Sequence, residues 1–231
     1  YLRAIVSELL DEQASLLSSL VCGVGERSVG AAMENLQLSA YVAPGCCAAL
    51  KLVNIPCVIG KSILVRKSEL RALGGLSMVK DSLAEDFLIG RHFENNGRKV
   101  LLSATPIMNV NVDIPVERSL ARHARWFKMR AVIHTPGFTA DFFANPIALS
   151  LLTLISAGFD QFLLAPGPGR FDDLAAMAAL LCACKTVLDG ITVRAIRGMP
   201  MKLQHVLWVP VKDVLMFCVW AYAIFSRSVY W

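Results

Sequence analysis

The sequence predicts a mixed α/β part followed by a membrane part. The chain has 231 residues, of which 55% are hydrophobic and 18% are charged, with a mean hydropathy of +0.54. An average soluble domain has about 25% charged residues, so the composition excludes a disordered chain and disfavours an ordinary soluble domain. Residues 1–135 hold 28 of the 41 charged residues, whereas residues 136–231 hold only 13 and contain no Glu. An aqueous and an apolar environment are therefore expected.

The first half alternates helical and strand-like segments. Apolar residues at three- and four-residue spacing predict helices, over residues 1–10, 29–38, 67–73 and 83–95. Continuous or alternating apolar residues predict strands, over residues 14–25, within 53–65 and over 99–103 before Pro106. Glycines follow the third and fourth helices and are typical helix ends. This alternation indicates layers of helices against a sheet.

Three long apolar runs make up most of the second half. They cover residues 142–159, 174–188 and 206–225. A bilayer crossing needs about 20 mainly apolar residues, so three membrane helices are predicted. The alternative, buried core helices of a soluble protein, would need more covering surface than this chain contains.

The charged residues inside these runs need partners, because a charge at membrane depth is costly. Lys185 and Asp189 are four residues apart on one helical face and can pair. Lys212 and Asp213 are sequence neighbours that are not expected to face each other. Each is therefore predicted to find another partner or to point into the protein.

The net charge of +5 is modest and forms no basic tail, which makes nucleic acid an unlikely partner and favours an anionic group or a lipid surface. The seven Cys residues lack metal-binding spacing and are predicted to be reduced, with no zinc site. The first residue is Tyr1 and no signal peptide is visible. We therefore expect the chain to be a fragment.

Two acids open the predicted helix at residues 83–95. Glu85 and Asp86 lie in its first turn, where the helix dipole favours negative charge. They are either capping acids or functional carboxylates.

A basic segment precedes the first apolar run. Residues 116–134 interleave five cations with apolar side chains, and the segment can lie in a membrane interface with Trp126 at headgroup depth. One interpretation is a plain amphipathic anchor. The other is a diphosphate clamp, in which Arg125 binds two phosphate oxygens with its planar guanidinium and Trp126 walls the site.

The order of these motifs resembles a known family. An acidic pair, a helix ending in Gly97, a strand and then RHARW (residues 122–126) resemble inverting nucleotide-sugar glycosyltransferases of the GT-A fold, which carry an ED pair and a (Q/R)xxRW motif. The segments CVIGKSILVRKSELRALGGL (57–76) and DGITVRAIRG (189–198) resemble ceramide glucosyltransferases. Bacterial enzymes that glycosylate hopanoid lipids share this pattern.

The resemblance implies transfer of a hexose, of the glucose or N-acetylglucosamine type, from a UDP-sugar to a lipid hydroxyl with inversion. Asp86 would be the catalytic base, while Glu85, Arg122, Arg125 and Trp126 would bind substrate. The implied organisation is the C-terminal, Rossmann-like portion of the catalytic domain over residues 1–115, an interfacial amphipathic helix over 116–135 and a membrane domain of about three helices over 136–231.

The sequence also departs from the family. Two earlier aspartate motifs, one of them a DxD-like element that holds a divalent metal and the UDP-sugar, do not occur in it. We therefore expect Mg²⁺ or Mn²⁺ to bind the full-length enzyme through ligands outside this chain, and the chain alone to be inactive. His92 and His123 are predicted to be surface histidines, and Cys57 a buried small residue or a family feature.

Two alternatives remain open. A processive polysaccharide synthase shares the ED and RxxRW pattern but needs a channel of many helices. A non-catalytic membrane subunit or small transporter would explain the apolar half but not the ordered motifs. The predicted location is a membrane crossed several times, with the catalytic part in the cytoplasm, because the basic cluster precedes the first run. A bacterial inner membrane is favoured over an internal eukaryotic membrane.

Overall fold

A computed structural model describes residues 1–164, 170–226 and 228. The described part of the chain is a mixed α/β structure built on a three-stranded sheet of order β2-β1-β3. The central strand is β1 (Leu16–Val24), which pairs antiparallel with β2 (Ile63–Val65) and parallel with β3 (Val100–Val110). β1 is buried along nearly its whole length, as its continuous apolar run predicts. The mixed α/β prediction is thus confirmed for these residues.

β3 is longer than predicted. The expected strand stopped before Pro106, whereas the observed strand continues to Val110. β3 pairs with β1 on one side only, and its register shifts opposite Ser19–Val21, between Ser103 and Ile107. Pro106 lies in this irregular stretch, where no ladder hydrogen bond from its nitrogen is needed. Within residues 53–65, only Ile63–Val65 forms a strand.

Three helices of the first half form where the sequence predicts them. These are α1 (Leu2–Asp11), α4 (Lys67–Ala72) and α5 (Glu85–Asn95), and a short 3₁₀ helix η2 (Gly75–Val79) separates the last two. The helix predicted over residues 29–38 ends too early, because the observed helical stretch continues to residue 53. α2 (Val29–Leu36) runs through a π-helical segment η1 (Gln37–Val42) into α3 (Ala43–Val53), and Pro44 is tolerated in the first turn of α3.

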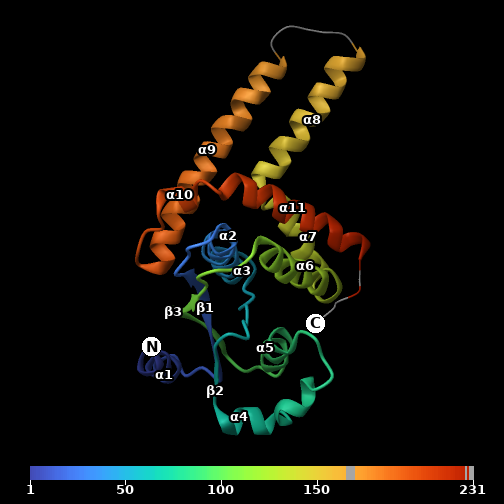
Figure 1. The fold of residues 1–231 in the computed structure, drawn as a ribbon. Helices are drawn as coiled ribbons and strands as arrows, with labels where there is room; N and C mark the ends of the chain where they lie inside the picture. Colours follow the sequence, from blue (N-terminus) through green and yellow to red (C-terminus); the bar gives the residue numbers. More distant parts are fainter. Residues whose placement is uncertain (165–169, 227, 229–231) are drawn as a thin grey trace.

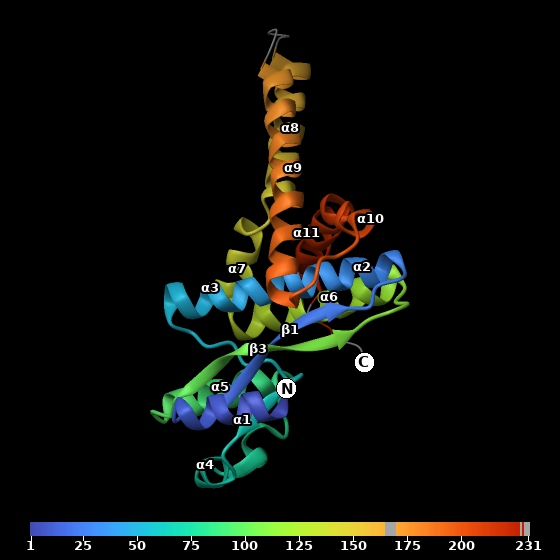
Figure 2. The same ribbon diagram turned by 90° about the vertical axis from the view of Figure 1, so that its left-hand side faces the viewer.

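The second half is helical in the described residues. Its helices are α6 (Val116–Ile133), α7 (Thr135–Phe143), α8 (Pro146–Leu164), α9 (Arg170–Arg197), α10 (Leu203–Val206) and α11 (Val209–Phe225). α8 and α9 lie side by side and project away from the rest of the molecule, and α11 runs across their base (Figures 1 and 2). The α2–α3 helix runs crosswise between the sheet and this hairpin (Figure 2).

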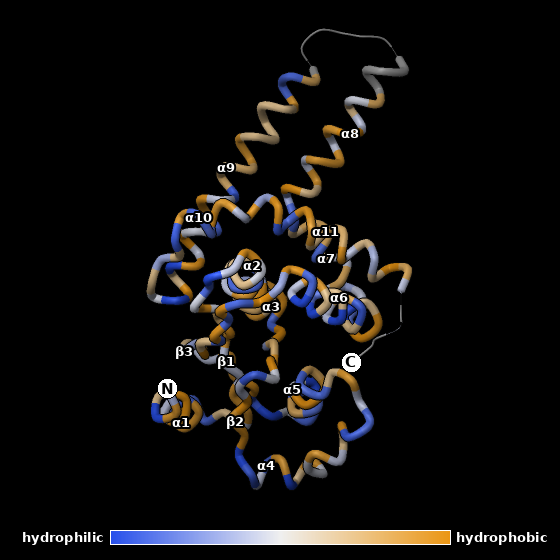
Figure 3. Tube along the Cα trace, in the orientation of Figure 1, coloured by the Kyte–Doolittle hydropathy of each residue, from blue (hydrophilic) through white to orange (hydrophobic). Residues whose placement is uncertain are grey.

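Among the residues that the structure describes, three helical segments are long and apolar enough to cross a membrane: residues 29–53, 171–197 and 203–225. Two of them contain the predicted runs at 174–188 and 206–225, and the first was not predicted. The predicted run at 142–159 is broken, because α7 and α8 form a pair bent by 64° around Asn145, which could count as a fourth segment. Asn145 caps α8 by accepting from the Ala148 amide at 3.1 Å, which fixes the bend. The projecting hairpin is predominantly apolar (Figure 3).

The four charged residues considered in the apolar runs, Lys185, Asp189, Lys212 and Asp213, are paired. Lys185 donates to Asp189 at 2.6 Å, which confirms the predicted pair. Lys212 and Asp213 are both buried, as one predicted alternative required, but they also pair with each other. The expectation that these neighbours would not meet was wrong, because the flexible four-carbon stem of Lys212 brings its ammonium back to the adjacent carboxylate.

Candidate functional site

Asp86 lies at the start of α5 with both carboxylate oxygens held by backbone amides. The amide of Gly60 donates to Oδ2 at 2.8 Å, and the amide of Phe87 donates to Oδ1 at 2.7 Å. Asp86 is partly buried, whereas the neighbouring Glu85 is exposed. The two donors fix the orientation of the Asp86 carboxylate and leave lone pairs for a further partner.

The segment around Gly60 packs closely against the Asp86 carboxylate. Ser18 of the central strand accepts from the Ile59 amide at 2.8 Å, which anchors the segment to the sheet. A Cβ added at Gly60 would lie 3.1 Å from Oδ2 of Asp86. A larger residue at position 60 would therefore crowd the carboxylate.

A buried carboxylate organises the RHARW helix. Glu34 of α2 accepts from Arg122 at 2.6 Å through Oε1, and from Ser119 at 2.7 Å through Oε2. His123 lies 3.0 Å from the same Oε2. Ser119, and Arg122 with His123 one turn later in α6, thus converge on one glutamate that is fully buried. The arrangement locks α6 against α2.

His123 is buried, so the prediction that it is a surface histidine was wrong. Its periodic neighbours Ser119 and Phe127 are buried with it, which makes this face of α6 the one that packs inside the molecule. His92 on α5 is partly exposed. One sign of the Glu34 contact is present in the sequence, because Glu34 is the lone charged residue of a mainly apolar helix and needs a partner when it is buried.

The remaining residues of the motif lie beside this cluster. The ring of Trp126 meets the ring of His123 edge-on, with centroids 5.2 Å apart, and both Trp126 and Arg125 are partly exposed. Arg122 is thus engaged with Glu34 inside the protein, whereas Trp126 is positioned through its contact with His123.

The acidic pair and the RHARW helix meet where α6 ends. Phe87, next to Asp86, contacts His134 with ring centroids 6.0 Å apart. His134 separates α6 from α7 and caps α7 by accepting from the Gly137 amide at 3.1 Å. The carboxylate therefore lies on the side of the sheet domain that faces the apolar helices.

Cys57 precedes the Gly60 segment and is partly buried. A hydrogen bond from the Cys46 thiol lowers the pKa of Cys57, while its burial acts in the opposite direction. Cys57 and Cys46 belong to one apolar cluster with Leu20 of the central strand. The expectation of a buried small residue is met only in part.

Metal binding has little support in the described residues. Within residues 1–164, 170–226 and 228, no group of three or more His, Cys, Asp or Glu side chains is arranged to hold a metal ion. Glu85 and Asp86 alone do not make such a group.

Comparisons with known proteins place the chain in a family. The model of "Glycosyl transferase family 21" matches residues 1–231. Ceramide glucosyltransferase 3 of Caenorhabditis elegans is 32% identical over 90 residues, which are 39% of this chain and 18% of that protein. Ceramide glucosyltransferase 1 of the same organism is 28% identical over 78 residues, or 34% of this chain and 17% of that protein. No solved structure matches significantly.

The segments matched in the two ceramide glucosyltransferases cover less than a fifth of each relative, whereas the family model covers the whole chain. The chain belongs to glycosyltransferase family 21.

Proposed function

We propose that this chain is part of a membrane-bound enzyme that transfers a hexose from a UDP-sugar to a lipid hydroxyl, such as that of ceramide or a hopanoid, with inversion. The observation that carries the proposal is the orientation of the Asp86 carboxylate by two amides, beside the junction of α6 and α7. Family membership supports sugar transfer, and the resemblance to the GT-A pattern supports the role of the acidic pair.

Asp86 is proposed as the catalytic base. A neutral alcohol is a weak nucleophile, so a carboxylate within hydrogen-bond reach would accept its proton as the oxygen attacks the anomeric carbon. The bond to the UDP oxygen breaks on the opposite face of the sugar, which inverts the anomeric centre. A positioned base contributes about 10²- to 10⁴-fold in rate. Glu85, exposed next to Asp86, is proposed as a substrate-binding neighbour.

The RHARW helix is proposed to stabilise the leaving group. Arg125 would bind the diphosphate with its planar guanidinium as negative charge develops there. Arg122 would contribute a second positive charge while its contact with Glu34 holds the helix in place. Trp126 would shape the acceptor entrance. No step is assigned to a metal, since no metal-binding group occurs among the described residues and the expected Mg²⁺ or Mn²⁺ ligands belong to motifs absent from this sequence.

The apolar helices explain where the acceptor would come from. A lipid with its tail in the bilayer presents its hydroxyl at the interface, and Phe87, next to Asp86, contacts His134 at the junction of α6 and α7. Membrane lipids are thus proposed as partners, with the catalytic part in the cytoplasm. The bacterial inner membrane remains the favoured location.

Lipid-dependent release of UDP by the full-length enzyme tests the proposal. The proposal predicts UDP release only when UDP-sugar and a hydroxyl lipid are both supplied, with one sugar attached to each lipid. Long polymers formed without added lipid would identify a processive polysaccharide synthase instead. Absence of UDP release with every lipid and sugar tested would favour a non-catalytic subunit.

A further inference from the structure

Helix α11 buries its two charged residues in the protein and exposes a row of apolar residues on the opposite face. Lys212 and Asp213 are 0% and 3% exposed, although both are charged. The opposite side carries exposed residues at helical spacing, which we call the α11 stripe: Leu207 in the turn before the helix, and Val211, Cys218, Tyr222 and Phe225. Leu207, which begins the stripe, is 61% exposed. A helix in contact with water has the reverse distribution.

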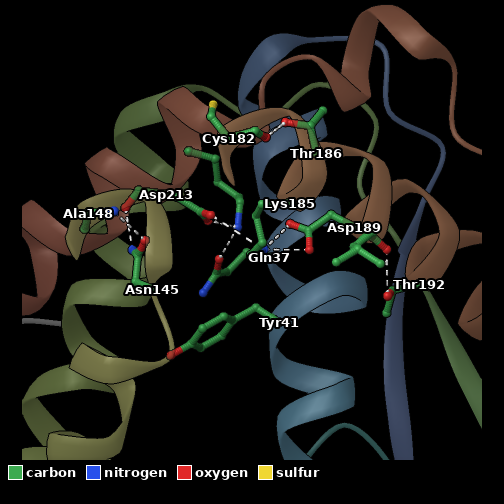
Figure 4. Close-up of polar contacts among 12 residues, drawn as sticks. Gln37, Tyr41, Asn145, Ala148, Cys182, Lys185, Thr186, Asp189, Thr192 and Asp213 are labelled. Carbon is green, nitrogen blue, oxygen red and sulfur yellow. Dashed lines mark hydrogen bonds and ion pairs between the residues drawn. The ribbon is translucent and has the colours of Figure 1, made fainter. Parts of the chain in front are cut away.

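The inward face of α11 closes a polar cluster beneath the hairpin. Lys212 donates to Gln37 of η1 at 3.1 Å and pairs with Asp213. Asp213 also lies 3.6 Å from Lys185 of α9, and Lys185 reaches Asp189 (Figure 4). These contacts satisfy the charges inside the protein, so α11 exposes no charge along its stripe. They also fix which face of α11 points outward.

The direction of α11 distinguishes it from α8 and α9. The two hairpin helices project together from the molecule, whereas α11 runs across their base in Figure 1 and lies beside the lower part of α9 in the perpendicular view of Figure 2. Two further hydrogen bonds hold α11 at the base of the hairpin. The Asn145 amide between α7 and α8 donates to the Asp213 carbonyl at 2.7 Å, and Trp220 donates to the Phe138 carbonyl at 2.9 Å. If α8 and α9 cross the bilayer, α11 lies along its surface.

We propose that α11 is an in-plane membrane helix whose stripe inserts into the headgroup and acyl boundary of the bilayer. The hairpin at whose base this stripe lies also exposes apolar side chains, among them Ile155 and Leu180. Lipid is therefore its occupant. Because the charges of α11 are buried in the protein, its contact with the membrane interface would come from the apolar stripe alone. The hairpin then supplies the only crossings in residues 136–226 that the structure describes, so both ends of this segment lie on one side of the membrane. This inference does not depend on which sugar or lipid the enzyme uses.

Depth measurements along the stripe test the proposal. A fluorophore is attached to a single cysteine at position 207, 218 or 225 of the full-length protein in phosphatidylcholine–phosphatidylglycerol vesicles. Leu207 and Phe225 are separated by about 27 Å along a helix of 1.5 Å rise per residue, nearly the thickness of the hydrocarbon core. An in-plane helix predicts equal quenching at all three positions by nitroxides near the headgroup. Weaker quenching at 218 than at both 207 and 225 would show a spanning helix, whose ends lie near opposite surfaces, and would overturn the proposal.

A substitution and a matched control complete the test. Leu207→Asp should reduce nitroxide quenching at position 218 and increase quenching by aqueous iodide, because it places a charge in the stripe. Leu76→Asp is the control, since Leu76 is also 61% exposed but lies in η2 of the sheet domain. It should change neither signal. Iodide quenching of the unsubstituted stripe, or protection from both quenchers by a second protein copy, would refute lipid contact.

The side of the membrane on which the segment after α11 lies provides a test that needs no cysteine replacement. A protease-cleavable tag after Trp231 should be cut from the same side of sealed vesicles as the loop at Lys61. Cleavage of the two sites from opposite sides would mean an odd number of crossings between them, and the in-plane assignment of α11 would be wrong.

Discussion

Replacing Glu34 with Gln should loosen helix α6 and lower the free energy of unfolding by about 3 kcal/mol. The carboxylate of Glu34 receives hydrogen bonds through both oxygens, from Arg122 on one and from Ser119 on the other. A glutamine offers one oxygen and one NH₂ group. In either orientation of the amide Arg122 loses its counter-charge, and when the NH₂ group is turned toward Arg122 two donors also face each other.

The magnitude follows from the burial of the pair. Removing one partner of a buried ion pair costs about 3 to 5 kcal/mol, because the other charge is left uncompensated. The Glu34 side chain is 0% exposed, but that of Arg122 is 22% exposed and can recover some hydration. The lower end of the range therefore applies. It corresponds to a change of about 10²-fold in the unfolding equilibrium.

Hydrogen–deuterium exchange of residues 116–133, together with thermal unfolding, measures the effect. Glu26→Gln is the matched control, since Glu26 is also buried and pairs with Arg197 of α9 at 3.2 Å rather than with α6. Both variants should unfold at lower temperature, but only Glu34→Gln should speed exchange in α6. It should also lower turnover, because a displacement of about 1 Å at a site can cost 10²-fold. Unchanged α6 exchange in Glu34→Gln, or equal acceleration in both variants, would refute the reasoning.

Three further predictions concern the site and the orientation. Gly60→Ala should lower turnover about tenfold or more while the protein stays folded, because the added methyl, 3.1 Å from Oδ2, displaces the Asp86 carboxylate; wild-type turnover would show that this geometry is unimportant. Arg125→Lys should reduce turnover nearly as much as Arg125→Ala, since lysine keeps the charge but loses the planar donor pair; a Lys variant with near-normal turnover would favour a plain anchor. In sealed, right-side-out vesicles, protease should leave the loop at Lys61 intact, because the basic helix before the hairpin indicates a cytoplasmic sheet domain; cleavage from outside would reverse this orientation.

Local patterns were sufficient to predict several elements. The strand β1 and the helices α1, α4 and α5 each carry their own signal of continuous or periodic apolar residues, ended by Gly or by charges. The extension of α2 into α3, which contains Pro44, was not predicted. The structure accommodates Pro44 in the first turn after the π-helical segment, where no backbone donor is lost.

Contacts between distant residues were beyond the sequence patterns. Glu34 lies 85 to 89 residues before Ser119, Arg122 and His123, so no local spacing links them. The apolar run of α11 had the length of a membrane span, but composition gives no direction for a helix. Its orientation follows from packing on the hairpin base and from the buried partners of Lys212 and Asp213.

Asp86→Asn in the full-length enzyme tests the proposed role of the acidic pair most directly. Asparagine keeps the size of the side chain and one oxygen acceptor but cannot take up the proton of the attacking hydroxyl. Turnover with saturating lipid and UDP-sugar should fall by about 10² or more, while the affinity for UDP-sugar and the melting temperature stay close to those of the wild type. Wild-type turnover in a folded Asp86→Asn enzyme that binds UDP-sugar would contradict the assignment of Asp86 as the base.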